Sequence, residues 1–273
     1  MLVSVIVPTY KDLNALELIL EAFDNQTYKT FEVIIAEDDD SQDTRDFLST
    51  QNRKYNINHV FHENRGNRKA SIMNRALLYV KGKYVIFIDG DTIPYSTFIE
   101  AHVSLSAPKT ILCGRRVNLG DKVSSDLREK KMSAQKIEKN YFKMYNYLKS
   151  DNMRHYEQGI AFKVNSFIYN LIQKFGKNIN LLASNYSCFK EDIFEVNGFD
   201  ENLPYAPHRD DTDLQWRLVR SGCVLKSCKY CANLFHLNHA RSERREEGIA
   251  NLKIIEEKKR QDEYVALVGI YGK

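Results

Sequence analysis

The first part of the chain alternates between short apolar runs and stretches in which apolar residues recur at helical spacing. Runs this short, bounded by turn-forming residues, are typical of strands buried on both faces of a parallel sheet, and they occupy residues 2–7, 31–36, 59–61 and 83–88. Between them, apolar residues recur every three or four positions and predict helices over residues 13–23, 44–48 and 69–80. This alternation predicts an α/β fold whose mostly parallel, Rossmann-like sheet is flanked by helices.

The middle of the chain, residues 121–177, is basic and rich in aromatic residues. It holds 12 Lys and Arg against six Asp and Glu. Its apolar residues share helical faces, one with Phe142, Tyr145 and Leu148 and another with Phe167, Leu171 and Phe175. We expect a basic helical insert here. Two interpretations remain open: the stripes pack onto their own domain, or they meet an anionic membrane surface or a lipid-linked substrate.

The remaining segments complete one predicted domain. Residues 181–189 and 226–237 are expected to be strands, and residues 204–208 an irregular loop. A helix is expected to begin at Arg209 and to stop at Ser221-Gly222, and a charge-rich helix to follow over residues 241–261. We therefore expect a single domain over 1–273, divided into a nucleotide-binding half (1–115), a helical insert (116–180), an acceptor and catalytic half (181–240) and a C-terminal helical tail (241–273).

Composition limits the protein classes. The chain of 273 residues is 43% hydrophobic and 28% charged, as is ordinary for a globular protein. No apolar run reaches the roughly 18 residues of a membrane span, and the chain begins with a predicted strand rather than a signal peptide. Five cysteines without a disulfide-like spacing favour a reducing, cytoplasmic setting. A net charge of +4 does not indicate a nucleic-acid partner.

Candidate chemistry is concentrated at Asp89-Gly90-Asp91, directly after the strand 83–88. Ligands of open α/β sheets bind at the carboxyl edge of the strands. Two carboxylates this close repel one another unless a cation lies beside them, and Mg²⁺ and Mn²⁺ combine carboxylate ligands with substrate phosphates. The motif therefore predicts a metal–diphosphate site. A solvated Asp-Gly turn is the simpler alternative.

Two further acidic clusters follow the same logic. Glu37 to Asp40 comes directly after the predicted strand 31–36, and Asp210, Asp211 and Asp213 open the helix that follows Arg209. The first cluster also fits a solvated loop that caps a helix, and the second fits favourable charges at a helix N-terminus. Three carboxylates, however, exceed what capping requires.

Histidine and cysteine residues near residue 236 leave two metal hypotheses open. His236, or alternatively His239, follows a predicted strand and could complete a metal site at Asp91. Cys228 and Cys231 form a C-x-x-C pattern upstream of these histidines, which suggests structural zinc. Because the segment is predicted to be a strand, the two cysteines should point to opposite faces, which argues against zinc.

In this order and spacing, the motifs resemble glycosyltransferase family 2, the inverting nucleotide-sugar transferases of the GT-A fold. The resemblance covers roughly residues 1–115 and 181–240. It implies that the end of the first strand and the first acidic pair hold the nucleotide, through Pro8, Thr9, Tyr10, Glu37 and Asp38. Asp39 and Asp40 stand where the family commonly has glycine and serine, so the carboxylate that contacts the base is open by a residue or two.

The resemblance assigns the other site residues as well. Asp89-Gly90-Asp91 matches the DxD motif that holds Mn²⁺ or Mg²⁺ on the nucleotide diphosphate, with His236 as a further metal ligand. Asp211 is implied to be the general base, with Asp210 beside it to position the acceptor or to take its place. Residues 66–74 match a family stretch only loosely, and they add Arg68 and Asn74 as contacts to sugar or phosphate.

The function implied is metal-dependent transfer of a hexose from a nucleotide-sugar, by family habit a UDP-sugar, to a glycan or lipid-linked acceptor. Synthesis of bacterial surface polysaccharide is the implied setting, with the protein in the cytoplasm or on the inner face of the membrane. The alternatives are a phosphatase of the haloacid dehalogenase type and a non-catalytic sugar-nucleotide-binding protein. For the phosphatase, Thr92 stands one residue early and the motif lies far from the N-terminus.

Overall fold

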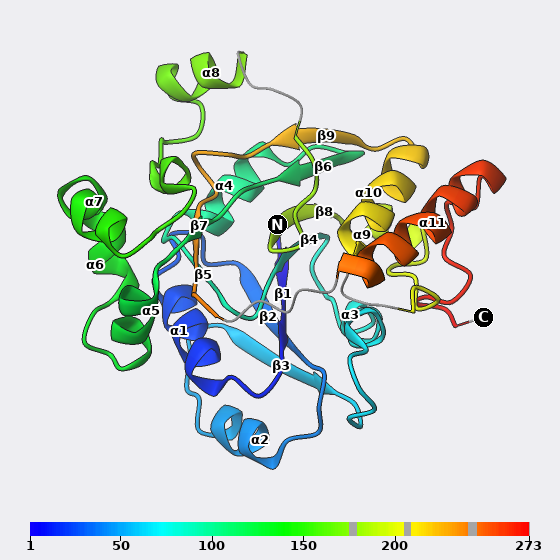
Figure 1. The fold of residues 1–273 in the computed structure, drawn as a ribbon, viewed down its shortest axis with the longest axis horizontal. Helices are drawn as coiled ribbons and strands as arrows, with labels where there is room; N and C mark the ends of the chain where they lie inside the picture. Colours follow the sequence, from blue (N-terminus) through cyan, green and yellow to red (C-terminus); the bar gives the residue numbers. More distant parts are fainter. Residues whose placement is uncertain (175–178, 205–208, 240–244, 273) are drawn as a thin grey trace.

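The centre of the molecule is a seven-stranded sheet (Figure 1). The computed structural model describes residues 1–174, 179–204, 209–239 and 245–272. The strands of this sheet are β1 (Val3–Thr9), β2 (Phe31–Glu37), β3 (Asn56–Phe61), β4 (Tyr84–Ile88), β6 (Thr110–Cys113), β8 (Asn185–Phe189) and β9 (Val224–Ser227).

The strand order is β3-β2-β1-β4-β8-β6-β9. β3, β2, β1 and β4 are parallel neighbours, and β9 is parallel to β6. β8 is antiparallel to both β4 and β6, so it is the one strand of this sheet that runs against the others. The mostly parallel α/β fold predicted from the sequence is therefore confirmed, and β8 joins the second half of the chain to the first.

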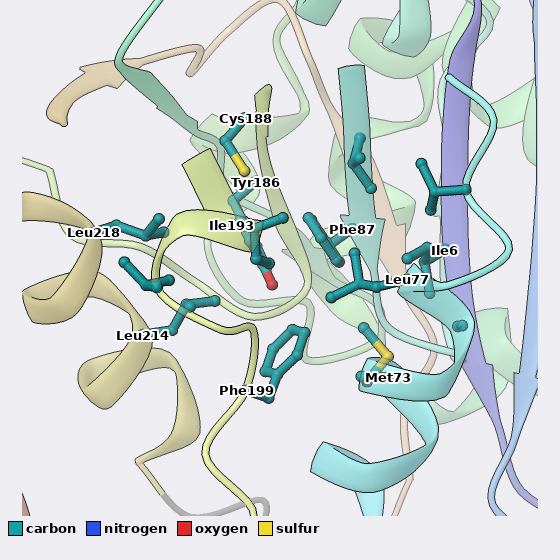
Figure 2. Packing of buried hydrophobic residues seen from close by; sticks show 14 of the residues in the cluster. Ile6, Met73, Leu77, Phe87, Tyr186, Cys188, Ile193, Phe199, Leu214 and Leu218 are labelled. Atoms are coloured by element: carbon teal, nitrogen blue, oxygen red, sulfur yellow. The ribbon is translucent and has the colours of Figure 1, made fainter. Parts of the chain in front are cut away.

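Alternating side chains divide the sheet between two helical layers. Val3, Val5 and Val7 of β1 contribute to a core with α1 (Leu13–Asp24), α4 (Phe98–Leu105) and part of α2 (Gln42–Ser49). Ile6 and the β4 residue Phe87 contribute to a core with α3 (Lys69–Leu77), α9 (Lys190–Glu195) and α10 (Asp210–Arg220). Figure 2 shows this second core, with α3 and α10 facing the strands from either side of Phe199.

A small three-stranded sheet lies beside the first. It has the order β5-β10-β7 and consists of β5 (Thr92–Pro94), β10 (Leu234–His236) and β7 (Val117–Asn118). The predicted continuous strand over 226–237 is therefore wrong, because β9 belongs to the large sheet and β10 to the small one. The chain turns between the two, with Tyr230 at φ 65°.

The basic insert is helical, as predicted. It contains α5 (Asp121–Arg128), α6 (Ala134–Lys139), α7 (Tyr141–Ser150), the 3-10 helix η1 (Tyr156–Gly159) and α8 (Phe167–Lys174). Ile137, Tyr141 and Leu148 are buried against the small sheet. In contrast, Phe142 is 72% exposed, so the predicted stripe is only partly covered by its own domain. Phe175 of the second predicted stripe lies outside the described residues.

The C-terminal helix α11 (Arg245–Gln261) is attached to α10 through buried charges. Lys258 donates to Asp213 on α10 at 2.9 Å and to Asp200. Asp213 also accepts a hydrogen bond at 2.7 Å from Arg217, whose side chain is fully buried. Of the predicted loop 204–208, only Pro204 is within the described residues, and the predicted helix over 241–261 is seen from Arg245. None of the described helices has the length and apolar character required to cross a bilayer.

Replacing Lys258 with alanine should destabilise the fold, because the carboxylates of Asp213 and Asp200 would stay buried without that cation. Removing one partner of a buried ion pair costs about 3 kcal/mol or more. Urea unfolding measures the loss. The adjacent Lys259→Ala is the matched control, because Lys259 is exposed and, among the described residues, its ion pair is with Glu256 on its own helix, and we expect a change below about 0.5 kcal/mol. Equal effects of the two substitutions would contradict this account.

Candidate active site

A cleft of about 600 Å³ opens at the carboxyl ends of β1 and β4. These strands are parallel neighbours, so the residues that follow them meet at one edge of the sheet. Seven residues predicted to form the site line this cleft: Pro8, Thr9, Tyr10, Asp38, Asp89, Gly90 and Asp91. The sequence analysis missed five other lining residues, which are Asp12, Gly66, Asn67, Lys69 and Ile72.

Gly90 allows the two strand ends to approach closely. A Cβ atom at this position would lie 2.1 Å from the backbone oxygen of Pro8. No side chain can be accommodated at that distance, so the glycine between the two aspartates is required by packing. The contact holds Asp89 and Asp91 against the end of β1, where the cleft begins.

Asp91 lies beside two imidazoles. Its Oδ2 is 3.2 Å from Nε2 of His236 and 3.1 Å from Nε2 of His239. β10 pairs with β5 so that His236 stands opposite Thr92, and the amide of Leu237 donates to the Asp91 carbonyl at 2.9 Å. Burial alone would raise the pKa of Asp91, but the hydrogen bonds and charges of the two histidines hold it well below its usual range.

This cluster has the donors of a divalent metal site. One ligand atom from each of Asp91, His236 and His239 lies within 4.8 Å of the others. The second oxygen of Asp91, Oδ1, is buried and has no hydrogen-bond partner in the described part of the chain, which is costly unless a cation or other partner meets it. One carboxylate with two imidazoles suits Mn²⁺ well, whereas Mg²⁺ prefers oxygen ligands.

Asp89 takes different partners. Its Oδ1 accepts from Lys69 Nζ at 2.9 Å, and its Oδ2 is 3.4 Å from Nη1 of Arg116. Asp89 therefore lies outside the Asp91–histidine group in this structure, although the sequence analysis placed it among the metal ligands. The two carboxylates on either side of Gly90 point to separate sets of cations.

Lys69 connects this motif to the third acidic cluster. Its Nζ is also 3.9 Å from Oδ2 of Asp210, at the start of α10. Burial would lower the pKa of Lys69, but Asp89 and Asp210 raise it above its ordinary value, so the ammonium group stays charged. Lys69 and Arg116 are two cations at the site that sequence reasoning missed. The one available signal was a lysine at the first position of a helix, where acidic residues are favoured.

Asp210 and Asp211 lie together at the amino end of α10, and both border a small hollow that Lys69 also lines. Burial and the charges of Asp211 and Asp89 raise the pKa of Asp210 to about 6, against the opposing effect of Lys69. Asp211 Oδ1 accepts from the amide of Thr212 at 2.7 Å. The preceding residue, Arg209, has φ 69°, which sets the sharp entry into the helix.

The first acidic pair is divided between the interior and the cleft. Asp38 lines the cleft, with Oδ1 2.6 Å from His62 Nε2 and Oδ2 accepting from the amide of Arg68 at 2.9 Å. Glu37, one residue earlier and on the other side of the strand, is fully buried against His59 at 2.8 Å. The structure thus brings Asp38, and not Glu37, to the proposed nucleotide site.

Two other predicted contacts lie away from the cleft lining. Asn74 is buried, and its amide donates to the Phe199 carbonyl at 2.8 Å and to Glu201 at 2.9 Å, while its oxygen accepts from the Phe199 amide. These bonds use its polar groups within the fold, so the structure gives Asn74 a packing role. The guanidinium of Arg68 donates to the Glu63 carbonyl, which leaves its backbone amide as its contact with Asp38.

Cys228 and Cys231 form no zinc site within the described ranges. Both are buried free cysteines, and the group of metal-ligating side chains found in this part of the structure is that of Asp91, His236 and His239. The prediction that the cysteines alternate along a strand was wrong, because both lie in the turn after β9. No group of three metal-ligating side chains in the described residues includes either cysteine, so the zinc hypothesis is without support.

Comparison with known proteins adds a family to this geometry. The model described as "Glycosyl transferase family 2" matches residues 4–170, more than half of the chain. Chondroitin synthase of Escherichia coli is 22% identical over 245 residues, which are 82% of this chain and 33% of that protein. UDP-Glc:alpha-D-GlcNAc-diphosphoundecaprenol beta-1,3-glucosyltransferase of E. coli is 28% identical over 110 residues, 40% of this chain and 43% of that protein. The chain thus spans less than half the length of each of these relatives.

Solved structures share the fold at low sequence identity. The mannosyltransferase PcManGT from Pyrobaculum calidifontis, in complex with GDP-Man and Mn²⁺, has a TM-score of 0.60 at 18% identity, covering 95% of this chain and 64% of that one. S. aureus TarS 1-349 in complex with UDP-GlcNAc has a TM-score of 0.59 at 16% identity, covering 93% and 65%. These likenesses confirm the GT-A fold.

If the Asp91 cluster binds a divalent ion, His236→Ala should weaken the binding of Mn²⁺ at least tenfold, because a buried imidazole ligand is lost. Calorimetric titration of Mn²⁺ into the protein measures the change. His155→Asn is the control, because His155 is exposed at φ 56°, a backbone conformation that asparagine tolerates. Equal Mn²⁺ affinity of the two variants would remove His236 from the site.

Proposed function

The chain belongs to glycosyl transferase family 2, and we propose that it is an inverting, metal-dependent hexosyltransferase. The proposed donor is a nucleotide-sugar, most consistent with a UDP-sugar, and the proposed acceptor is a hydroxyl group of a glycan or a lipid-linked saccharide. One observation carries the proposal. Asp38, Lys69 and Asp91 line the same cleft, and Lys69 Nζ also lies 3.9 Å from Asp210 on a separate helix. Donor-binding and proton-accepting groups are thus provided from different elements.

The proposed nucleotide position lies between the end of β1 and Asp38. Thr9 and Tyr10 line the cleft there, and the half-exposed ring of Tyr10, with Lys11 Nζ 5.1 Å from its centroid, would stack on the nucleotide base. Asp38 is held in place by His62 and the Arg68 amide, which fixes the carboxylate that would accept a hydrogen bond from the base. The structures of TarS contain UDP or UDP-GlcNAc, and one E. coli relative is named for UDP-Glc, which supports a uridine nucleotide, whereas PcManGT contains GDP-Man.

Asp91, His236 and His239 would hold a divalent cation, with Mn²⁺ favoured over Mg²⁺ by the imidazole donors. When bound, such an ion offsets the charge that develops on the leaving diphosphate. Lys69 supplies a second, fixed positive charge at the cleft floor, because its raised pKa keeps it protonated. The complex of PcManGT with GDP-Man and Mn²⁺ supports this choice of cofactor.

The chemical step needs one base and no enzyme nucleophile. The acceptor oxygen forms a bond to the sugar C1 while the bond between C1 and the phosphate oxygen breaks, and the acceptor proton passes to a carboxylate. Displacement from the opposite side inverts C1. We assign the base to Asp211, and we assign Asp210 to holding Lys69 and adding negative charge beside the base.

A lipid-linked acceptor fits this chain in two respects. The E. coli relative is named as acting on a diphosphoundecaprenol-linked sugar, and the insert of this chain is basic and aromatic. We therefore propose a role in building bacterial surface polysaccharide, with the protein in the cytoplasm at the inner face of the membrane. The family assignment leaves the phosphatase alternative without support. A non-catalytic sugar-nucleotide-binding protein is the remaining alternative, and loss of transfer in the base variant tests it.

Asp211→Asn should lower kcat about 10²- to 10⁴-fold, the usual contribution of a general base, and should leave the affinity for UDP within twofold. Asp43→Asn is the control, because Asp43 lies in the first turn of α2, away from the cleft. The measurement is transfer from UDP-sugars to a saccharide acceptor. Undiminished transfer by the Asp211 variant would refute the assignment of the base.

The pH dependence tests Asp210. Its pKa is raised to about 6, so its charge is present above that pH and is lost as the pH falls through it. Transfer by the wild type should therefore rise between about pH 5 and 7 and then level off. Asp210→Asn has no such charge to lose, so its smaller kcat should no longer rise through pH 6. If the transfer rate of the Asp210→Asn variant rises with pH as that of the wild type does, Asp210 is not the group that causes the rise.

Titration of UDP, GDP and dTDP, each with and without Mn²⁺, identifies the donor class. We expect UDP to bind tightest and to depend on Mn²⁺. Asp91 and the two histidines would hold the ion beside the diphosphate, and Asp38 would contact the uracil. Asp91→Asn should remove the Mn²⁺ dependence. Failure of all three nucleotides to bind would overturn the proposed function.

A further inference from the structure

Helix α8 carries the most exposed large apolar side chain of the described chain. Phe167 is 80% exposed, and its neighbours Ile168 and Leu171 are 51% and 46% exposed. Phe142 on α7 is 72% exposed. Isolated exposed apolar residues are ordinary, but several on one short helix mark an interaction surface.

The helix presents these residues away from the protein. Tyr169 is its buried residue, packed in the core with its hydroxyl 3.4 Å from the Ser227 carbonyl at the end of β9. At about 100° per residue, Phe167 and Leu171 each lie about 200° from Tyr169, on the opposite side of the helix. Figure 1 shows α8 at the periphery, beyond β9. Tyr169 thus anchors the helix while its other face remains uncovered.

The insert also carries lysines that are not paired with any described carboxylate. Elsewhere in the insert, Lys122, Arg128, Lys130 and Lys131 pair with carboxylates. The described carboxylates leave six other lysines of the insert without an ion pair within 4 Å, and these lie on α6, α7, α8 and the segment before α8: Lys136, Lys139, Lys143, Lys149, Lys163 and Lys174. Glu138, the acidic residue directly before Lys139 in the sequence, already accepts hydrogen bonds from the amide and hydroxyl of Ser96.

A cleft of about 840 Å³ links α7 to the segment that leads into α8. Its lining includes the aromatic side chains of Tyr141, Phe142 and Phe162, the cations Lys139 and Lys163, and two carboxylates, Glu100 and Glu138, which accept hydrogen bonds from Thr27 and Ser96. Its aromatic side chains suit the hydrocarbon part of a lipid, and Lys139 and Lys163 suit an anionic head group, because the two carboxylates already accept from hydroxyl groups of the protein. The cleft therefore connects Phe142 with residues 161–165, the segment that leads into α8.

We propose that this surface docks the protein on an anionic lipid bilayer. The docking face consists of Phe142, Phe167, Ile168 and Leu171 with Lys139, Lys143, Lys163 and Lys174. Its apolar side chains enter the interfacial region, and its lysines contact anionic head groups. A second copy of the chain is a poor occupant, because two such faces would bring eight ammonium groups together. The inference rests on the proposed function only in that a lipid-linked acceptor would require this location.

Vesicle sedimentation tests the proposal. The full chain should bind vesicles of phosphatidylglycerol and phosphatidylethanolamine at least tenfold more tightly than vesicles of phosphatidylcholine, and about 0.5 M NaCl should weaken that binding, because salt screens exposed charges. Phe167→Ser/Ile168→Ser/Leu171→Ser should reduce binding to the anionic vesicles at least tenfold. Lys139→Gln/Lys143→Gln/Lys163→Gln/Lys174→Gln should reduce it similarly and remove the effect of salt.

The control removes three exposed apolar side chains elsewhere, as Leu78→Ser/Tyr79→Ser/Leu267→Ser, and should bind vesicles like the wild type. Thermal unfolding verifies that every variant is folded. Equal binding of the wild type to both vesicles, or retained binding by the α8 variant, overturns the proposal. The proposal also fails if the wild type is a dimer in light scattering and the α8 substitutions abolish the dimer but leave vesicle binding unchanged. UDP affinity, measured in solution, should be the same in all variants, so a failure of nucleotide binding is distinguishable from a failure of docking.

Discussion

The contact of Lys69 with Asp89 and Asp210 is the interaction on which the arrangement of the site depends. It joins the first residue of α3, the residue after β4 and the first residue of α10. Carboxylates from two elements would repel one another across the edge of the sheet, and the protonated amine of Lys69, whose side chain is 20% exposed, offsets that repulsion. The apolar packing of α3 and α10 against β4 (Figure 2) holds these three charges in place.

The small sheet determines the surroundings of Asp91, the second aspartate of the Asp89-Gly90-Asp91 motif. β10 is only three residues long, but its pairing with β5 sets His236 opposite Thr92 and so beside Asp91. The chain reaches this position by leaving the large sheet after β9 and turning back through buried cysteines. Backbone hydrogen bonds between β10 and β5, rather than a local sequence motif, thereby place His236 beside the Asp91 carboxylate.

Charge on α10 is divided between a small hollow and the interior. Asp210 and Asp211 border the hollow that Lys69 also lines, whereas Asp213, two residues further along, is buried with Arg217 and Lys258. The buried group fixes the helix against α11, and the first two aspartates are presented by the helix so fixed. Aspartates close together on one helix therefore have different roles: Asp210 and Asp211 serve the proposed chemistry, and Asp213 stabilises the fold.

The sequence by itself determined the alternation of strands and helices, the parallel order of the first strands and the position of each acidic motif after a strand. These features depend on periodicity and turn chemistry among near neighbours, which a sequence displays directly. It placed Asp38, Asp89 and Asp91 at one edge of the sheet for that reason. Only the tertiary structure decided that Lys69 and Arg116 neutralise Asp89, that both His236 and His239 lie at Asp91, and that Glu37 and Asn74 face inward. Those contacts join residues far apart in the chain, and they follow from how whole elements pack, because no local pattern specifies which distant charge a side chain will meet.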